Sequence, residues 1–256
     1  MTAALPEALL TSPIAHRALH DIGRGRPENS RAAIRAAMEA GFGIEIDLQL
    51  SRDNQALVFH DYDLGRLTGE TGPIHARSAA EAGGIALKYG DGETIPTLPE
   101  VLELVNGQAP LLIELKDQDG AMGPDIGPLE AATIAALRGY DGPVAIMSFN
   151  PHSVAELARL APEIPRGLVT ESYDPADLPL PAAICDRLRE IPDFDRVGAG
   201  FISHEVTDLT RPRVVELRRK GVPVLCWTVR SAQIDTEARR NADNVTFEGY
   251  LAAMPA

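Results

Sequence analysis

The stretch GIEIDLQLSRDNQALVFHD, residues 43–61, decides the fold. It contains two strand-like runs, residues 43–50 and 56–60, which are separated only by SRDNQ. Parallel strands need a connection of about a dozen residues or more. These two runs are therefore expected to pair as an antiparallel hairpin that turns near Asp53 and Asn54.

The hairpin also brings polar side chains together. Residues two apart in a strand point to the same side, so Glu45 and Asp47 share one face of their strand. Counting equal numbers of residues out and back from the turn places His60 opposite residues 46–48. His60 is thus expected at the level of the two carboxylates.

Strand-like runs alternate with helical patterns along the whole chain, which is typical of a parallel sheet. The expected strands are residues 13–16, 43–50, 56–60, 110–116, 144–148, 167–170, 199–203, 222–229 and 244–247. The expected helices include residues 30–40, 98–105, 129–137, 152–160, 211–220 and 231–241.

The returning arm of the hairpin is one strand more than an eight-stranded barrel needs. Without it, eight parallel strands remain, and they predict a TIM (β/α)8 barrel. We expect a single domain, residues 1–256, with the β-hairpin and a small insertion after the second barrel strand. The insertion, at about residues 61–96, is expected over the C-terminal rim of the barrel.

Composition limits the partners. The 256 residues are 45% hydrophobic and 24% charged, as in ordinary globular proteins. A formal net charge of −13 argues against nucleic acid and anionic membranes. Two cysteines are too few for a disulfide framework, and neither a signal peptide nor a run of about 18 apolar residues is evident. We expect a cytoplasmic protein that acts on a small molecule without a stable membrane anchor; the oligomeric state is left open.

Three carboxylates indicate a metal centre. Glu45, Asp47 and Glu114 lie in otherwise aliphatic runs, where a carboxylate needs a partner. Oxygen ligands suit Mg²⁺ or Ca²⁺ rather than zinc. The alternatives are solvated carboxylates on an edge strand, or a buried ion pair between Glu114 and Lys116. A third carboxylate on another strand favours a convergent site for one divalent cation, Mg²⁺ or Ca²⁺.

Histidines at strand ends indicate acid–base chemistry. His16 and Arg17 end the first expected strand, where TIM-barrel active sites lie. His16 and His60 are candidates for acid and base because imidazole titrates near neutral pH. For Asp61, an Asx turn is favoured over orientation of His60. The remaining histidines are expected on the surface or in loops: His20, His75, His152 and His204.

Other polar and aromatic residues can have either a structural or a functional role. Asn29 or Ser30 is a natural N-cap for the helix that follows, and Glu28 beside them is within reach of the site. Trp227, the only tryptophan, and Phe149 lie at strand ends. Either core packing or contact with substrate fits their positions.

Seven motifs occur in a specific order along nearly the whole chain. They are AHR (15–17), PENS (27–30), IEIDLQLSRDN (44–54), VFHD (58–61), IELK (113–116), SF (148–149) and WTV (227–229). This set resembles the glycerophosphodiester phosphodiesterase family. The resemblance implies a TIM barrel with an insertion after the His-Asp strand. It also implies metal-dependent hydrolysis of glycerophosphodiesters to sn-glycerol 3-phosphate and an alcohol.

The resemblance further implies roles for individual residues. A divalent cation, Mg²⁺ or Ca²⁺, would be bound by Glu45, Asp47 and Glu114. The general acid and base would be His16 and His60, in an order that is left open. The phosphate would be held by Arg17 and Lys116, and the substrate pocket would be lined by Trp227.

Two features depart from the family pattern. Ala18 stands where the family usually has glycine, and an alanine would distort the first loop if that position needs a positive φ. The loop of residues 19–26 is longer than expected and carries Arg24 and Arg26, which are predicted beside the phosphate.

Other functions fit less of the pattern. A lysophospholipase D-like phosphodiesterase would need an apolar mouth, and a non-catalytic phosphoanion-binding relative would not need all the catalytic groups. An enolase-like lyase would use a strand-borne lysine, which Lys116 matches only loosely. The nucleophile, water or the neighbouring glycerol hydroxyl, is left open.

Overall fold

The computed structural model describes residues 3–254. Within that range the strands are β1 (Ile14–Ala15), β2 (Gly43–Leu50), β3 (Ala56–Val58), β4 (Leu111–Leu115), β5 (Val144–Ser148), β6 (Arg166–Thr170), β7 (Phe201–Glu205), β8 (Val224–Val229) and β9 (Asn244–Phe247). The helices are α1 (Ala8–Thr11), α2 (Arg31–Glu39), α3 (Ala79–Ala82), α4 (Leu98–Val105), α5 (Pro128–Leu137), α6 (Pro151–Leu160), α7 (Ala182–Arg189), α8 (Pro212–Arg219) and α9 (Ala232–Ala238). Three short 3-10 turns are η1 (Ile22–Arg24), η2 (Ile74–Ala76) and η3 (Val206–Asp208).

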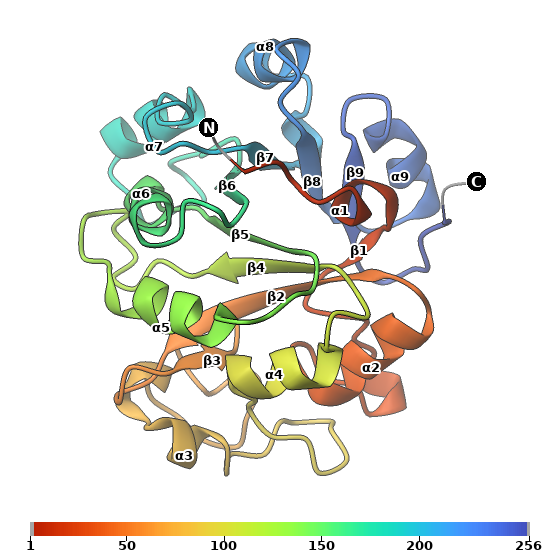
Figure 1. Ribbon diagram of the computed structural model, residues 1–256, viewed down its shortest axis with the longest axis vertical. Helices are drawn as coiled ribbons and strands as arrows, with labels where there is room; N and C mark the ends of the chain where they lie inside the picture. Colours follow the sequence, from red (N-terminus) through yellow and green to blue (C-terminus); the bar gives the residue numbers. More distant parts are fainter. Residues whose placement is uncertain (1–2, 255–256) are drawn as a thin grey trace.

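The strands close into a barrel (Figure 1). Their order is β1-β9-β8-β7-β6-β5-β4-β2-β3, and β1 also pairs with β2. Every pairing except that of β2 with β3 is parallel. The predicted TIM (β/α)8 barrel with one extra strand is therefore confirmed. The expectation for β7 was wrong by two residues at each end, and α1, α3 and α7 were not predicted.

The hairpin has the predicted register. Leu48 pairs with Val58 and Leu50 with Ala56, and the Phe59 N–H donates to the Asp47 carbonyl over 2.9 Å. If this register is extended by two residues beyond Val58, His60 lies opposite residue 46. The turn is possible because Asn54 adopts a left-handed conformation, φ 57°, which asparagine tolerates better than most residues.

The interior of the barrel is filled by alternate residues of the strands. Leu112, Met147, Val169, Phe201 and Leu225 belong to one buried cluster. Gly167 is required beside this cluster, because a Cβ there would lie 2.5 Å from the Phe201 ring. Helix α1 adds Leu9 to the cluster, and the Asn244 side chain donates to the Leu9 carbonyl over 2.9 Å, which ties α1 to β9.

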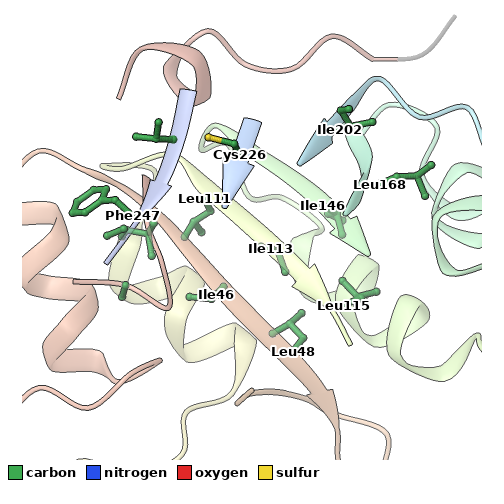
Figure 2. Packing of buried hydrophobic residues seen from close by; sticks show 14 of the residues in the cluster. Ile46, Leu48, Leu111, Ile113, Leu115, Ile146, Leu168, Ile202, Cys226 and Phe247 are labelled. Atoms are coloured by element: carbon green, nitrogen blue, oxygen red, sulfur yellow. The ribbon is translucent and has the colours of Figure 1, made fainter. Parts of the chain in front are cut away.

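The opposite faces of the strands pack against the surrounding helices. Figure 2 shows Ile46, Ile113, Ile146 and Leu168 in this second and larger cluster. Burial of each such side chain stabilises the fold by about 1.5–3 kcal/mol. The two clusters together explain why the strand sequences are aliphatic on both faces, as parallel barrel strands must be.

The insertion has a small cluster of its own. Leu57 and Phe59 of the hairpin arm pack with Leu64, Ile74 and Ile85, and α3 lies along β3 (Figure 1). Its first residues reach the mouth of the barrel, where the Tyr62 hydroxyl donates to the Asp117 carbonyl over 2.5 Å. None of the helices within residues 3–254 is long and apolar enough to cross a membrane.

Candidate active site at the carboxyl ends of the strands

The three predicted metal ligands converge inside the barrel mouth. Glu45 and Asp47 are each 1% exposed on β2, and Asp47 lies in register with Glu114 on the adjacent strand β4. One carboxylate oxygen from each residue lies within 4.8 Å of the others. The edge-strand interpretation of Glu45 and Asp47 is wrong, because β2 has a partner on both sides.

Two cations face these three carboxylates. The Lys116 Nζ lies 2.7 Å from Asp47 Oδ1 and 2.6 Å from Glu114 Oε1, so the alternative ion pair also exists. The Arg17 Nε lies 3.7 Å from Asp47 Oδ2, and the Arg17 backbone N–H donates to Glu45 Oε2 over 2.8 Å. When all three carboxylates are ionised, as they would be around a bound cation, their charge exceeds that of the two cations by one.

The carboxylates differ in how they are compensated. Burial alone would raise the pKa of Asp47, but Lys116, His60 and Arg17 hold that pKa well below its usual range. Burial raises the pKa of Glu45 well above its usual value, and the neighbouring Asp47 and Glu114 raise it further.

A divalent cation fits this arrangement. Among the described residues, the buried Glu45 Oε1 has no hydrogen-bond partner. Three hard oxygen donors with one unsatisfied buried oxygen and surplus negative charge match Mg²⁺ or Ca²⁺ chemistry. Glu45, Asp47 and Glu114 thus form a possible metal centre.

Asn29 and Glu28 hold the charged groups in place. The Asn29 side chain donates to Asp47 Oδ2 over 2.9 Å, and its Oδ1 accepts from the Asp47 N–H over 3.3 Å. Ser30, not Asn29, is the N-cap of α2, since its hydroxyl accepts from the Ala33 N–H. Glu28 receives a hydrogen bond of 2.8 Å from Arg17, so it belongs to the site.

Each candidate histidine is oriented by a carboxylate. His16 Nδ1 lies 2.6 Å from Glu248 Oε2, and His60 Nδ1 lies 2.7 Å from Asp61 Oδ1. An ionised carboxylate only accepts hydrogen bonds, so each Nδ1 carries the hydrogen and each neutral ring keeps its lone pair on Nε2. Burial lowers the pKa of His16, partly offset by the hydrogen bond to Glu248.

A cavity of about 910 Å³ is lined by both histidines and by most of the charged groups: His16, Arg17, Glu45, His60, Asp61, Glu114 and Lys116. Its charged wall comes from β1, β2 and β4. The other wall, from β5 to β8, is mostly apolar and includes Met147, Phe149, Val169 and Trp227. The Trp227 indole N–H donates to the Ser203 carbonyl over 3.0 Å, and its ring meets that of Phe149 edge to face, with centroids 5.5 Å apart.

Residues 16–247 match the glycerophosphoryl diester phosphodiesterase family. The chain belongs to this family. This match confirms the resemblance stated from the motifs, and with it the expectation that the protein is a phosphoric diester hydrolase.

Individual members support the same assignment. A glycerophosphodiester phosphodiesterase of Caldanaerobacter subterraneus subsp. tengcongensis is 35% identical over 168 residues, 62% of this chain and 66% of that protein. Another, of Bacillus subtilis, is 28% identical over 88% of this chain and 78% of its own length. A phosphodiesterase of Oleispira antarctica, solved in complex with the product sn-glycerol-3-phosphate, has a TM-score of 0.74 at 26% identity. That comparison covers 92% of this chain and 91% of the other.

The loop that departs from the family pattern keeps its hydrogen bonds. Ala18 has a φ of 63°, and Arg17 before it has a φ of 52°. Ala18 is nevertheless buried, and its N–H donates to the Glu45 carbonyl over 2.9 Å. The alanine therefore takes up the left-handed conformation that the position requires.

Three expectations about neighbouring residues were wrong. His204 is fully buried on β7, where it bonds Thr170, because the inner sheet can satisfy its ring nitrogens. Asp61 orients His60 instead of forming only an Asx turn. Arg24 and Arg26 line a second cavity instead of the cavity that holds the two histidines. The Arg24 Nε and the Arg26 Nη2 lie 3.3 and 3.5 Å from Asp21 Oδ2.

Three further groups of the site were not predicted from the sequence. Glu248 directly follows β9 and contacts His16, whereas Glu171, directly after β6, and Arg66 of the insertion line the cavity. The position of the two glutamates at the carboxyl end of a barrel strand is a signal that could have found them. Arg66 carries no comparable signal, since it reaches Glu28 and Asp61 only through the folding of the insertion.

Proposed function

We propose that this protein hydrolyses glycerophosphodiesters to sn-glycerol 3-phosphate and an alcohol, with a divalent cation, Mg²⁺ or Ca²⁺, held by Glu45, Asp47 and Glu114. One observation carries the proposal. Two carboxylate-oriented imidazoles line the same cavity as Glu45 and Glu114 of the three-carboxylate cluster. The cation would supply positive charge to a phosphorane-like transition state, which carries more negative charge than the diester.

The two histidines supply the proton transfers of the reaction. His16 and His60 each offer an Nε2, so one, as the neutral imidazole, removes a proton from the nucleophile, while the other, as the imidazolium with a second proton on Nε2, gives that proton to the leaving oxygen. Both proton transfers need an imidazole of fixed tautomer, which Glu248 and Asp61 provide.

The phosphate is held by cationic side chains. The Lys116 ammonium has three donors, of which Asp47 and Glu114 engage two, so one is left for a phosphate oxygen. The Arg17 guanidinium lies between Glu28 and Asp47 and supplies further charge-assisted hydrogen bonds. Trp227 lines the apolar wall against the alcohol or the glycerol.

The test is release of sn-glycerol 3-phosphate from glycerophosphocholine, measured with Mg²⁺, Mn²⁺, Ca²⁺ and a chelator. His16→Ala and His60→Ala are expected to lose at least about 10²-fold in kcat, since each removes one proton-transfer group. His75→Ala is the matched control, because His75 is exposed and lies outside the cavity. Full turnover by either active-site variant, or after exhaustive chelation, contradicts the proposal.

A lysophospholipase D-like activity is a second candidate. Met122, Met147, Val169 and Leu178 give the cavity an apolar wall that could contact an acyl chain. The same assay with a lysophospholipid separates the two. Faster turnover of the lysophospholipid than of every water-soluble glycerophosphodiester would favour this activity. Binding without turnover of any diester would instead indicate a phosphoanion-binding protein.

We also propose that residues 1–256 form one domain of a cytoplasmic enzyme with no nucleic-acid partner. The net charge of −13 supports this, because phosphate backbones would be repelled. Fractionation of cells and limited proteolysis test location and domain structure. A stable fragment lacking residues 61–96 and retaining the fold would define these residues as a dispensable insertion.

A further inference from the structure

One carboxylate in the cavity has no role in the chemistry described above. Glu171 directly follows β6 and lines the apolar wall; in the barrel order β6 stands four strands from β1, which Arg17 follows, and two strands from β4, which Lys116 follows. Thr170 is in register with His204 and Glu205 with Trp227, so Glu171 and Trp227 stand two strands apart at the same level. Neighbouring strands lie about 4.8 Å apart, which leaves room for a small group between the two side chains.

Glu171 is also unpaired. Among the described residues, no arginine, lysine or histidine lies within ion-pair distance of it and no hydrogen bond reaches its carboxylate. Its charged neighbours are themselves acidic: burial, together with Glu205, Glu114 and Asp177, raises its pKa to about 7. The other carboxylates that line the cavity each have a cationic or N–H partner: Glu45, Asp61, Asp63, Glu114 and Asp117.

An aromatic wall stands beside this carboxylate. Phe149 and Trp227 meet edge to face, and the hydrogen bond to Ser203 fixes the indole. The faces of aromatic rings attract cations, and a carboxylate nearby strengthens the attraction. An unpaired half-buried carboxylate next to aromatic rings is complementary to an ammonium group.

We propose that Glu171, Phe149 and Trp227 bind the ammonium group of a cationic alcohol, so that the preferred substrates are diesters of amino-alcohols of the ethanolamine or choline type. The inference rests on the proposed function for the position of the phosphate. A phosphate held at the charged wall by Arg17 and Lys116 directs one of its two alcohol groups across the cavity to Glu171. The positive end of that alcohol supplies the partner that the carboxylate lacks.

Binding can be measured without turnover, because Trp227 is the only tryptophan of the chain. Choline and ethanolamine are expected to change its fluorescence in a saturable way, whereas ethylene glycol, a neutral alcohol, has no effect. In Glu171→Gln, which keeps the shape and removes the charge, the affinity for both cations falls about tenfold. Asp177→Asn is the matched control, since it removes an exposed negative charge nearby that does not line the cavity.

The kinetic arm compares glycerophosphocholine, glycerophosphoethanolamine and glycerophosphoglycerol. The ratio of kcat/KM for either cationic diester to that for the neutral one falls about tenfold in Glu171→Gln and is unchanged in Asp177→Asn. The two cationic substrates show whether a primary or a quaternary ammonium is preferred.

Either of two binding results overturns the inference: no saturable effect of either cation on Trp227 fluorescence, or equal affinity in wild type and Glu171→Gln. An equal loss of all three activities with weaker metal binding also overturns it, because Glu171 would then serve the metal centre. Absence of any turnover by a wild-type protein that still binds choline through Glu171 contradicts the proposed function and leaves this subsite standing.

Discussion

Replacing Glu45 by glutamine distinguishes the contribution of Glu45 to metal binding from its effect on the stability of the metal-free fold. The glutamine keeps the shape of the side chain and can still accept the Arg17 N–H, which donates to Glu45 Oε2 over 2.8 Å. It removes one of three carboxylates that face Lys116 and Arg17, so the metal-free site becomes neutral. Metal-free stability should rise, whereas metal affinity should fall.

The direction of this change in stability follows from the pKa of Glu45. Burial, Asp47 and Glu114 raise this pKa in the folded protein. Ionisation of Glu45 therefore destabilises the metal-free fold at pH values above the ordinary pKa range of a glutamate. That penalty disappears as the pH falls below this range, and it is absent from Glu45→Gln at every pH. At pH 7.5 in a chelator, the variant should therefore be more stable than wild type, by about 1–3 kcal/mol.

The effect of the metal can be estimated from binding linkage. At a metal concentration of 100 times Kd, wild type gains about 2.7 kcal/mol. For a chain of this size that corresponds to a rise in Tm of about 5–10 °C. If the loss of one ligand weakens binding about 100-fold, the same concentration equals Kd and the gain falls to about 0.4 kcal/mol.

The assay is thermal unfolding followed by circular dichroism, in a chelator and in rising Mg²⁺, Mn²⁺ or Ca²⁺. Glu103→Gln serves as the control, because Glu103 is exposed on α4 and far in sequence from the site. A Glu45→Gln variant that keeps the full metal-induced rise in Tm, or that is less stable than wild type in the chelator, would refute the reasoning.

Three more outcomes are expected. Glu248→Gln lowers kcat by about 10²-fold because the His16 tautomer is no longer enforced. It also moves the acidic limb of the kcat/KM profile to lower pH, since Glu248 opposes the burial that lowers the pKa of His16; an unmoved limb would exclude His16 as its source. Ala18→Gly changes the free energy of unfolding by less than about 1 kcal/mol in urea titrations, because relief of the left-handed alanine is offset by the lost methyl group and the greater chain entropy of glycine. The preference for cationic over neutral diesters rises between pH 6 and 8 in wild type, because Glu171 becomes ionised in this range. Burial, Glu205, Glu114 and Asp177 raise its pKa to about 7. A ratio that does not change with pH would contradict this.

Much of the fold could be predicted from local pattern. The five-residue connection SRDNQ permits only a hairpin, and the remaining alternation of strands and helices leads to the barrel. The short helix α1 could not be predicted in this way. Four residues carry little periodicity, and α1 exists because Leu9 completes the barrel interior and Asn244 bonds its carbonyl.

The candidate site, like the fold, could be predicted only in part from local pattern. Charged groups two residues apart on a strand, such as Glu45 and Asp47, share a face by geometry alone. Partners distant in sequence do not follow from any local rule: His16 and Glu248 are 232 residues apart, and closure of β9 against β1 joins them. Likewise, His204 is polar and yet fully buried because Thr170 and Asp208 satisfy its ring.

The sequence by itself determined the barrel, its hairpin and the residue types of a phosphodiesterase site, because strand alternation and a connection too short to cross over are local constraints. Only the tertiary structure decided which charges are paired. Lys116 is held by two carboxylates and Glu114 by one ammonium, whereas Glu171 has no cation among the described residues. Electrostatic compensation depends on distances across strands that are remote in the chain, and the free energy of each charge follows from those distances and from burial.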